Sequence, residues 1–325
     1  MASLDNLEMF NRASFLTRLV ASSVKVSETA GGIIKNVMTA GDLKIVNKCD
    51  GGYDPQTEAD RRAQYCIVQS LQNRYKDLKI IGEEDETTAC PEVELGFSED
   101  VLNLESSLNS ELRNIKEEDV VVWVDPLDGT SEVALAVKNK NLALLEQVTV
   151  LIGIAHKGRA VAGIIHQPYF SENGRTVWAI NGCGVHGITP AQSNAKKVVV
   201  TTRSHLSESV SSALEALKNK DLADSIEKVG GAGYKVLKVL EGSAAYVFAS
   251  AGCKKWDTCA PEAVLEAAGG NLTDISGRKI RYDSNIQLNN TGGVLATASW
   301  VKHLDYVNSI PDDIKNQLPE VASKK

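Results

Sequence analysis

Apolar and polar positions alternate with a helical period near the start of the chain. Apolar residues recur every three or four positions through residues 15–24, which predicts one long helix from about residue 4 to residue 37. A second amphipathic stretch opens at Thr57, and Thr57 and Asp60 have the spacing of a capping box. The short apolar run LKII, residues 78–81, is ended by a glycine and predicts the first strand.

Longer apolar runs predict a sheet in the middle of the chain. The run VVVWV, residues 120–124, is short and continuous, as expected of a buried strand. Two further runs cover residues 148–156 and 159–168. Because only Lys157 and Gly158 separate them, we expect a tight hairpin.

The pattern changes in the second half of the chain. From residue 197 onward, strand-like runs alternate with helical ones, which favours an open α/β sheet. We therefore expect an antiparallel α+β unit over residues 1–165 and an α/β unit over residues 166–325. Residues 86–118 are acidic with patchy periodicity, so we expect a surface excursion containing one helix. Residues 131–147 are expected to form a loop or helix beside any cleft.

Composition narrows the class of protein. The 325 residues are 43% hydrophobic and 24% charged, which is typical of a soluble globular chain. A net charge of −7 and a pI near 5.4 argue against a nucleic-acid polymer or an anionic membrane as partner. No apolar run is long enough to span a bilayer, and the six cysteines have no zinc-like spacing. We expect a cytoplasmic protein whose partner is a small molecule, either monomeric or weakly homo-oligomeric.

Acidic residues follow two of the predicted strands. Glu83 stands in the GEED segment after LKII, and Asp125 and Asp128 follow VVVWV. Carboxylates at the ends of adjacent strands converge on one crevice, where their repulsion calls for a cation such as Mg²⁺. For GEED a solvated turn is an equally good interpretation. In DPLDGT, Pro126 stiffens the loop and both aspartates are held against a buried strand, which favours a site.

Several other residues have both a structural and a functional interpretation. Gly129 and Thr130 open a possible helix whose N–H groups could bind an anion, although Asp128 or Thr130 could simply be its N-cap. Asp257 precedes a predicted helix, and Asp60 lies in the first turn of another, so each could also be a capping residue. Each feature alone is indecisive.

A glycine cluster precedes the helix of the GYKVLKVLEG segment. VGGAGYK places Gly231 and Lys235 between a strand and a helix but matches neither a P-loop nor a dinucleotide fingerprint. A backbone turn is the alternative interpretation. Upstream, TTRSH ends a strand with Thr202 and His205, and His205 by itself would be a surface histidine.

Taken together, these segments resemble a known family. GEED, WVDPLDGT and WDTCAPEAVL, in this order and spacing, are similar to motifs of the lithium-sensitive, metal-dependent phosphomonoesterases that include inositol monophosphatase and fructose-1,6-bisphosphatase. Within that family, QTEADRRAQ, TRSH and VGGAGYK resemble the 3′(2′),5′-bisphosphate nucleotidases. The resemblance runs from about residue 15 to 300. It implies a layered α-β-α-β-α sandwich, combining the α+β and α/β units expected above.

The resemblance also implies roles for individual residues. It implies two or three Mg²⁺ ions and a pair of residues that activates the attacking water. The implied metal ligands are Glu83, Asp125, the Leu127 carbonyl, Asp128 and Asp257. The implied water-activating pair is Asp60 and Thr130, and the implied nucleotide contacts are Gly129, Thr202, His205, Gly231 and Lys235. Two departures are the long segment 131–147 and Tyr234, where the family pattern has Asn.

The implied reaction is hydrolysis of the 3′-phosphate of adenosine 3′,5′-bisphosphate to AMP and phosphate, without a covalent intermediate. The 5′-phosphosulfate analogue is a further expected substrate. An alternative is an inositol polyphosphate 1-phosphatase, which would use the same metals. A catalytically silent metal- or nucleotide-binding protein is a third hypothesis. It predicts a missing ligand, whereas all five implied ligand positions are present.

Overall fold

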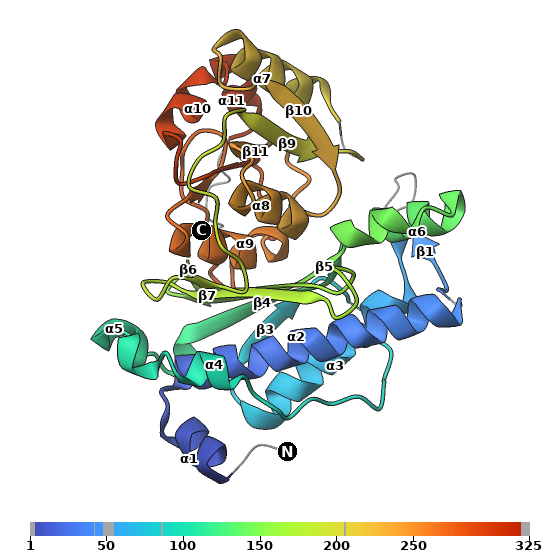
Figure 1. Ribbon diagram of the computed structural model, residues 1–325, viewed down its shortest axis with the longest axis vertical. Helices are drawn as coiled ribbons and strands as arrows, with labels where there is room; N and C mark the ends of the chain where they lie inside the picture. The colour runs from blue at the N-terminus through green and yellow to red at the C-terminus, as the bar shows by residue number, and fades with distance from the viewer. Residues whose placement is uncertain (1–3, 42, 48–54, 86, 205, 320–325) are drawn as a thin grey trace.

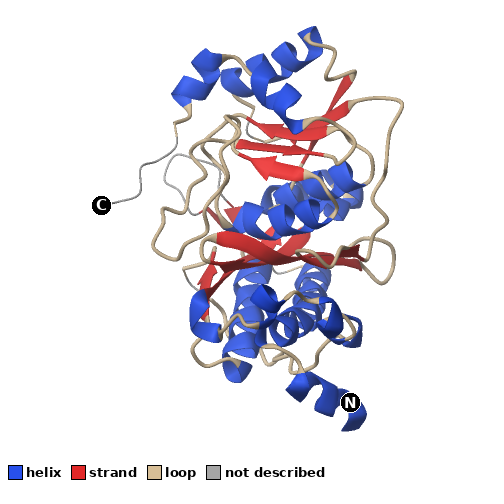
Figure 2. Cartoon of the chain, turned by 90° about the vertical axis from the view of Figure 1, so that its left-hand side faces the viewer, coloured by secondary structure: helices blue, strands red, loops and turns tan. Residues whose placement is uncertain are grey.

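The chain folds into five stacked layers. The computed structural model describes residues 4–41, 43–47, 55–85, 87–204 and 206–319. Helices, a six-stranded sheet, a pair of helices, a five-stranded sheet and further helices follow one another along the long axis of the molecule (Figures 1 and 2). This arrangement confirms the predicted α-β-α-β-α sandwich. No helix among the described residues is both long and apolar enough to cross a bilayer.

The first layer is built mainly from the N-terminal helices. The predicted single helix is wrong, because the chain turns at Ser14, whose ψ of 158° is extended. The capping box is confirmed: the Thr57 side chain accepts from the Ala59 N–H, and the Asp60 carboxylate accepts from the Thr57 N–H at 2.8 Å. The helices of this layer are α1 (Leu4–Arg12), α2 (Phe15–Ala40) and α3 (Glu58–Arg74).

The six-stranded sheet has the order β3-β4-β5-β6-β7-β8. β3 and β4 are parallel, and the remaining neighbours are antiparallel. The predicted hairpin is present, with Lys157 and Gly158 at φ values of 51° and 72° as a tight turn requires. Its strands are β3 (Lys79–Gly82), β4 (Val120–Asp128), β5 (Thr149–His156), β6 (Arg159–Gln167), β7 (Arg175–Ile180) and β8 (Val185–His186).

The acidic excursion between β3 and β4 is more than a surface loop. Val101, Leu102 and Leu112 are buried in the core formed by α2, α3 and the lower face of the sheet. Burial of these apolar residues explains why the segment packs across the first layer despite its weak periodicity. It contains α4 (Glu99–Leu102), α5 (Ser110–Arg113) and the 3₁₀ turns Glu105–Ser107 and Glu117–Asp119, and a separate small ribbon pairs β1 (Val46–Asn47) with β2 (Pro55–Gln56).

The second sheet has the order β10-β9-β11-β13-β12. β10, β9 and β11 are parallel, as the alternating pattern predicts. β13 pairs antiparallel with both of its neighbours, β11 and β12. Its strands are β9 (Val198–Thr202), β10 (Ser225–Val229), β11 (Ala245–Phe248), β12 (Asn271–Thr273) and β13 (Val294–Thr297). The helices of the outer layer beyond it are α7 (Glu208–Asn219), α10 (His303–Ser309) and α11 (Asp312–Gln317).

The middle layer consists of α8 (Ala232–Leu240) and α9 (Trp256–Ala267). α9 lies very close to the first sheet, because a glycine pair on β5 and β6 faces it. Gly153 and Gly163 are cross-strand neighbours, and a Cβ on Gly153 would stand 2.6 Å from the Ala260 nitrogen. A Cβ on Gly163 would overlap the Ala260 carbonyl oxygen. The two glycines therefore fix how near α9 can approach.

The proposed division of the chain at residue 165 lies inside β6. The first sheet continues to His186 and the second begins at Val198. A division into two units is therefore better placed in the loop between β8 and β9. Between β4 and β5, residues of the segment 131–147 form α6 (Thr130–Asn139) and a 3₁₀ helix, Leu142–Gln147.

A buried carboxyl group on α9 gives the fold a pH dependence. Burial raises the pKa of Glu262 to about 7, although it accepts hydrogen bonds from Tyr282 at 2.6 Å and Arg159 at 3.0 Å. Because the pKa of Glu262 is higher in the folded than in the unfolded chain, the protonated carboxyl group stabilises the fold. This contribution is complete below about pH 4.5 and is lost as pH rises through 7. We expect Glu262→Gln to reduce the loss of stability between pH 5 and 8. Melting temperatures of both proteins across that range test this, and parallel curves would contradict it.

Candidate active site

A cleft of about 670 Å³ opens where the two halves of the chain meet. It lies at the ends of β3 and β4 and at the start of α6, α8 and α9. Helix N-termini and strand ends thus face the same space, as expected of a ligand site in a layered α/β fold. Among the residues that line it are the predicted site residues Glu83, Asp128, Gly129, Thr130, Thr202, Gly231, Lys235 and Asp257.

Parallel pairing of β3 with β4 brings the first two acids together. Gly82 is opposite Val124 in the register, and the Glu83 N–H donates to the Val124 carbonyl at 3.1 Å. Glu83 therefore comes level with Asp125, the next residue on β4. A bulge begins at Asp125, whose Oδ1 accepts from the Leu127 N–H at 3.1 Å. The bulge turns the end of β4 into the cleft.

The pKa values show how closely the acids are packed. Asp125 is 2% exposed, and burial raises its pKa well above the usual range. The negative charges of Glu83, Asp128 and Asp257 raise it further. Burial and the charge of Asp128 also raise the pKa of Asp257 to about 6. Each group disfavours ionisation of its neighbours, which is the electrostatic condition that a bound cation relieves.

Asp128 joins the two halves of the chain. Its carboxylate accepts from the backbone N–H groups of Ala232 at 2.7 Å and Gly233 at 2.8 Å, at the start of α8. Thr149 on β5 donates its hydroxyl to the same carboxylate at 2.7 Å. Gly231, with φ of 60°, lies against this carboxylate, where a Cβ would come within 2.9 Å of Oδ2. Asp128 therefore satisfies the N-terminus of α8.

Asp257 enters the cleft from the other half. α9 begins at Trp256, two residues earlier than predicted, so Asp257 lies inside its first turn. Its Oδ2 accepts from the Lys254 N–H at 2.7 Å. Pro261 has no N–H and cannot bond the Asp257 carbonyl four residues earlier. The side-chain carboxylate and the backbone carbonyl of Asp257 therefore both lie in the first turn of α9.

The donor set fits a hard divalent cation. The predicted ligands supply only oxygen atoms, which is the preference of Mg²⁺. Among the described residues, no three carboxylate, histidine or cysteine side chains already surround one ion position. Asp128 accepts N–H groups of α8 with both oxygens, and Asp257 accepts the Lys254 N–H with one, so each of these oxygens keeps a second lone pair that a cation could use.

A second arrangement links α3 to α6. α6 begins at Thr130, and its N-cap is Gly129 with φ of 103°, not Asp128 or Thr130. The Thr130 hydroxyl is 3.0 Å from Asp60 Oδ1 and 3.1 Å from the Leu127 carbonyl oxygen. Asp60 is fully buried, and burial raises its pKa to about 6. A threonine hydroxyl at the cleft is thus backed by a carboxylate of near-neutral pKa.

Three of the predicted nucleotide contacts, Thr202, Gly231 and Lys235, line the cleft from the second half of the chain, whereas Gly129 lines it from the first. Thr202 ends β9, and Gly231 precedes α8. Lys235 is 5% exposed, donates to the Gly231 carbonyl at 2.9 Å and lies 5.4 Å from the centre of the Tyr246 ring. Burial lowers the pKa of Lys235. His205 lies outside the described residues.

Several of the residues that line the cleft were not predicted from the sequence. Glu132 on α6 is buried beside Gly230, lies 3.4 Å from Arg203 Nη1 and lines the same cleft as Lys235. Tyr246 and Phe248 also line the cleft. Their spacing of two on β11 puts them on one face of the strand, which is a signal that the sequence does contain.

Solved structures place the fold in a known class. The inositol monophosphatase of Thermotoga maritima superposes with a TM-score of 0.62 at 19% identity, covering 91% of this chain and 98% of its own. CysQ from Bacteroides thetaiotaomicron, a bacterial member of the inositol monophosphatase family, gives 0.62 at 20% identity, covering 88% and 98%. The molecule therefore has the inositol monophosphatase fold.

Sequence comparison then establishes the family. The inositol monophosphatase family profile matches residues 16–312, and the chain belongs to this family of phosphatases, which is metal-dependent and generally uses Mg²⁺. The chain is 44% identical over 323 residues to 3′(2′),5′-bisphosphate nucleotidase 1 of Homo sapiens, covering 95% of this chain and 99% of that protein. The Golgi-resident adenosine 3′,5′-bisphosphate 3′-phosphatase of Rattus norvegicus is 30% identical over 312 residues, with 91% and 82% covered.

Proposed function

We propose that the chain is a Mg²⁺-dependent phosphomonoesterase that hydrolyses the 3′-phosphate of adenosine 3′,5′-bisphosphate, giving AMP and inorganic phosphate. The 5′-phosphosulfate analogue is a second substrate of the same site. The observation that carries the proposal is the full-length similarity to a relative named as a bisphosphate nucleotidase. The meeting of acids from β3, β4 and α9 in one cleft with a lysine supports it.

Five oxygen donors would hold the metal. When bound, two or three Mg²⁺ ions would neutralise the phosphate and make a water molecule more acidic. The mutual repulsion of Asp125, Asp257 and their neighbours supports this assignment, since a cation removes it. The proposed ligands are Glu83, Asp125, the Leu127 carbonyl, Asp128 and Asp257.

The attacking water would lose its proton through Thr130. The Thr130 hydroxyl would accept this proton while passing its own to Asp60, which it already contacts at 3.0 Å. A carboxylate with a pKa of about 6 is a suitable general base near neutral pH. Thr57 holds Asp60 in place through its backbone N–H, so the acceptor is preorganised. The water oxygen attacks phosphorus in line, the bond from phosphorus to the ribose 3′-oxygen breaks on the opposite side, and that oxygen takes up a proton from solvent water.

The second half of the chain would supply most contacts to the rest of the nucleotide. Lys235 supplies a positive charge for the 5′-phosphate, while Thr202, Gly129 and Gly231 line the same cleft. His205 is proposed with them on the resemblance alone. A neutral sugar ring without a second phosphate would leave the buried ammonium of Lys235 without a substrate partner.

A panel assay tests the proposed reaction. Phosphate release is measured from adenosine 3′,5′-bisphosphate, its 5′-phosphosulfate analogue, AMP and inositol phosphates, each with Mg²⁺ and with EDTA. We expect Mg²⁺-dependent release from the first two compounds. Release chiefly from inositol phosphates would favour the alternative suggested by a relative named putative inositol monophosphatase 3 in Drosophila melanogaster, 31% identical over 311 residues. Binding without turnover would indicate a silent regulatory protein.

Lys235→Ala is expected to act on substrate binding. The ammonium would contact the 5′-phosphate equally in the ground and transition states, so its loss raises KM by about tenfold to a hundredfold with a small change in kcat. Steady-state kinetics with adenosine 3′,5′-bisphosphate measure both constants. A fall in kcat at constant KM would contradict the assignment. Lys238→Ala, on the same helix but outside the cleft lining, is the matched control.

We also propose the cytoplasm as the place of action. The five described cysteines are free thiols, which is typical of a reducing compartment. We propose a monomer or weak homo-oligomer as the active form, because this chain itself supplies every residue of the proposed site. The cleft takes a small nucleotide, and the net charge of −7 disfavours a nucleic-acid polymer.

A further inference from the structure

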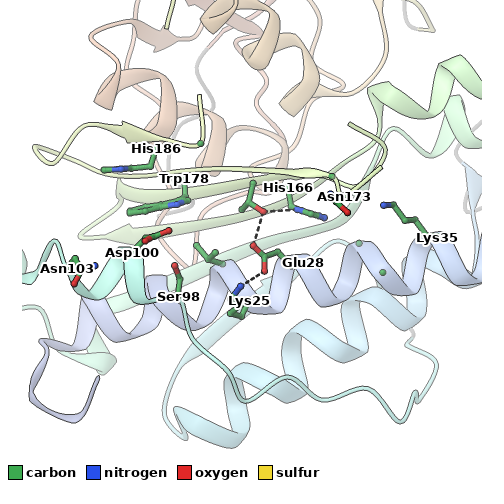
Figure 3. Close-up of a pocket in the computed structure, with 16 residues that line it drawn as sticks. Lys25, Glu28, Lys35, Ser98, Asp100, Asn103, His166, Asn173, Trp178 and His186 are labelled. Carbon is green, nitrogen blue, oxygen red and sulfur yellow. Dashed lines mark hydrogen bonds and ion pairs between the residues drawn. The ribbon is translucent and has the colours of Figure 1, made fainter. Parts of the chain in front are cut away.

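A second pocket, of about 800 Å³, lies on the other side of the first sheet. It is bounded by α2, by the start of α4 and by β6, β7 and β8, on the face opposite α8 and α9 (Figure 3). Of the residues that the structure describes, none lines both this pocket and the catalytic cleft. None of the proposed catalytic roles uses it.

His166 lies in the wall of this pocket as part of a hydrogen-bonded chain. It is 5% exposed, and its Nδ1 is 2.9 Å from the Thr176 hydroxyl on the neighbouring strand. Thr176 lies 3.3 Å from Glu28 Oε1, and Lys25 donates to Glu28 Oε2 at 2.8 Å. Figure 3 shows this chain as dashed lines running from Lys25 to His166.

The donor and acceptor roles along this series of hydrogen bonds fix the tautomer of His166. Thr176 donates its one hydroxyl hydrogen to Glu28, whose carboxylate also accepts from Lys25. Thr176 must then accept from His166, which places the ring proton on Nδ1. Burial, assisted by the charge of Lys35, lowers the pKa of His166 to about 4, so the ring is neutral. Nε2 therefore carries a lone pair.

That lone pair has no protein partner. Nε2 of His166 makes no hydrogen bond with any residue that the structure describes. His166 lines the pocket, so a ligand or water there can supply the donor that this nitrogen lacks. The pocket is therefore expected to receive a molecule with an O–H or N–H group at this position.

Charge sets the orientation of such a molecule. Lys35 forms no ion pair with a described residue and donates only to the Glu172 carbonyl, at 3.2 Å. Lys25 and Glu28 neutralise each other. Asp100 lies beside Trp178, at the end of the pocket away from Lys35 (Figure 3). An anionic group is thus attracted to the Lys35 end and repelled from the Asp100 end.

We propose that this pocket binds a small hydroxylated organic anion, such as a sugar acid or sugar phosphate. One hydroxyl donates to Nε2 of His166, and the anionic group lies beside Lys35. The remaining hydroxyls face polar side chains along the pocket, including Ser98, Asn103 and Asn173. The volume of about 800 Å³ is in the range of small-molecule sites.

Two adjacent glycines in α2 fit this assignment. A Cβ on Gly31 would overlap the His166 ring, so this glycine admits the imidazole. Gly32, by contrast, lines the pocket, and outside its own stretch of helix no described residue has an atom within 4 Å of an ideal Cβ position. Glycine is unfavourable inside a helix, and packing against the protein does not explain it at position 32. A larger residue there would project into the open space.

Calorimetry with the full chain in EDTA tests the proposal. The probes are gluconate, glucose 6-phosphate, glucose and acetate. We expect gluconate or glucose 6-phosphate to bind with a Kd of about 1 mM or tighter. The first result identifies a carboxylate and the second a phosphate as the anion. Glucose lacks the charge and acetate lacks the hydroxyls, so each is expected to bind at least about tenfold more weakly.

Two variants locate the site. Lys35→Met is expected to weaken binding about tenfold, and Gly32→Phe to abolish it by filling the pocket. Lys196→Met, at an exposed loop position, is the matched control and leaves binding unchanged. Melting curves and phosphate release from adenosine 3′,5′-bisphosphate show that each variant is folded.

Nuclear magnetic resonance of the imidazole nitrogens gives an independent readout. The free protein is expected to show His166 with its proton on Nδ1, and the bound probe to shift the Nε2 resonance. Absence of binding by both anions would overturn the proposal. It would also be overturned if glucose bound equally well, or if binding survived Lys35→Met and Gly32→Phe unchanged.

Discussion

Replacing Asp125 by asparagine is expected to lower Mg²⁺-dependent phosphate release by about a thousandfold or more. Asp125 occupies the centre of the acidic cluster, where Glu83, Asp128 and Asp257 all act on its pKa. Asparagine has nearly the same shape and can still accept from the Leu127 N–H, so the bulge at the end of β4 is preserved. The variant therefore removes the charge that attracts the cation and leaves the fold intact.

Two measurements separate the loss of metal binding from loss of structure. Phosphate release is followed across a Mg²⁺ titration, and melting temperature is recorded with and without Mg²⁺. The ion is expected to raise the melting temperature of the wild-type chain, since ligands stabilise the state that binds them, and to raise that of Asp125→Asn much less. Asp85→Asn, an exposed acid of the same GEED segment, is the control. Normal turnover by Asp125→Asn would remove it from the metal site.

Gly163→Ala is expected to cost about 3 kcal/mol of stability and to lower the melting temperature by roughly 5–10 °C. The new methyl group would meet the carbonyl oxygen of Ala260, which is backbone and cannot rotate away. α9 would have to move off the first sheet. Because Asp257 lies in the first turn of α9, phosphate release is expected to fall as well.

Gly32→Ala is the matched control for this substitution. Its Cβ meets no atom within 4 Å, and it replaces glycine by alanine inside α2, so we expect stability to rise by up to about 1 kcal/mol. Thermal melts of Gly163→Ala and Gly32→Ala under the same conditions measure the two stability changes. Equal melting temperatures would mean that the close approach of α9 contributes little to the fold.

Short local patterns in the sequence predict the capping box, the hairpin turn and the acidic strand ends of this structure. Thr57 and Asp60 form the capping box that their spacing indicates, and Lys157 and Gly158 form the expected turn. Both features depend on backbone groups only a few residues apart. The acids after β3 and β4 were predicted to converge because they follow adjacent strands. The two strands are parallel, within a unit that was predicted to be antiparallel, and this pairing brings their ends to the same edge of the sheet.

What the sequence did not reveal depends on distant contacts. The turn at Ser14 interrupts an apolar pattern that continues through it, so periodicity alone gave one helix where two exist. Val101 and Leu112 are buried because α2 and the sheet lie over them, although their own segment is acidic. Glu132 was not singled out from the sequence, because its place beside Gly230 appears only when α6 and the loop after β10 are brought together.

The position of α9 has a consequence for how substrate reaches the cleft. The backbone of this helix rests directly on β5 and β6, while its other side belongs to the core of the second sheet. Because α9 packs against both sheets, the two sheets could separate only by breaking the contacts of this helix. We therefore expect ligands to enter and leave through the opening of the cleft, without a hinge motion between the two sheets.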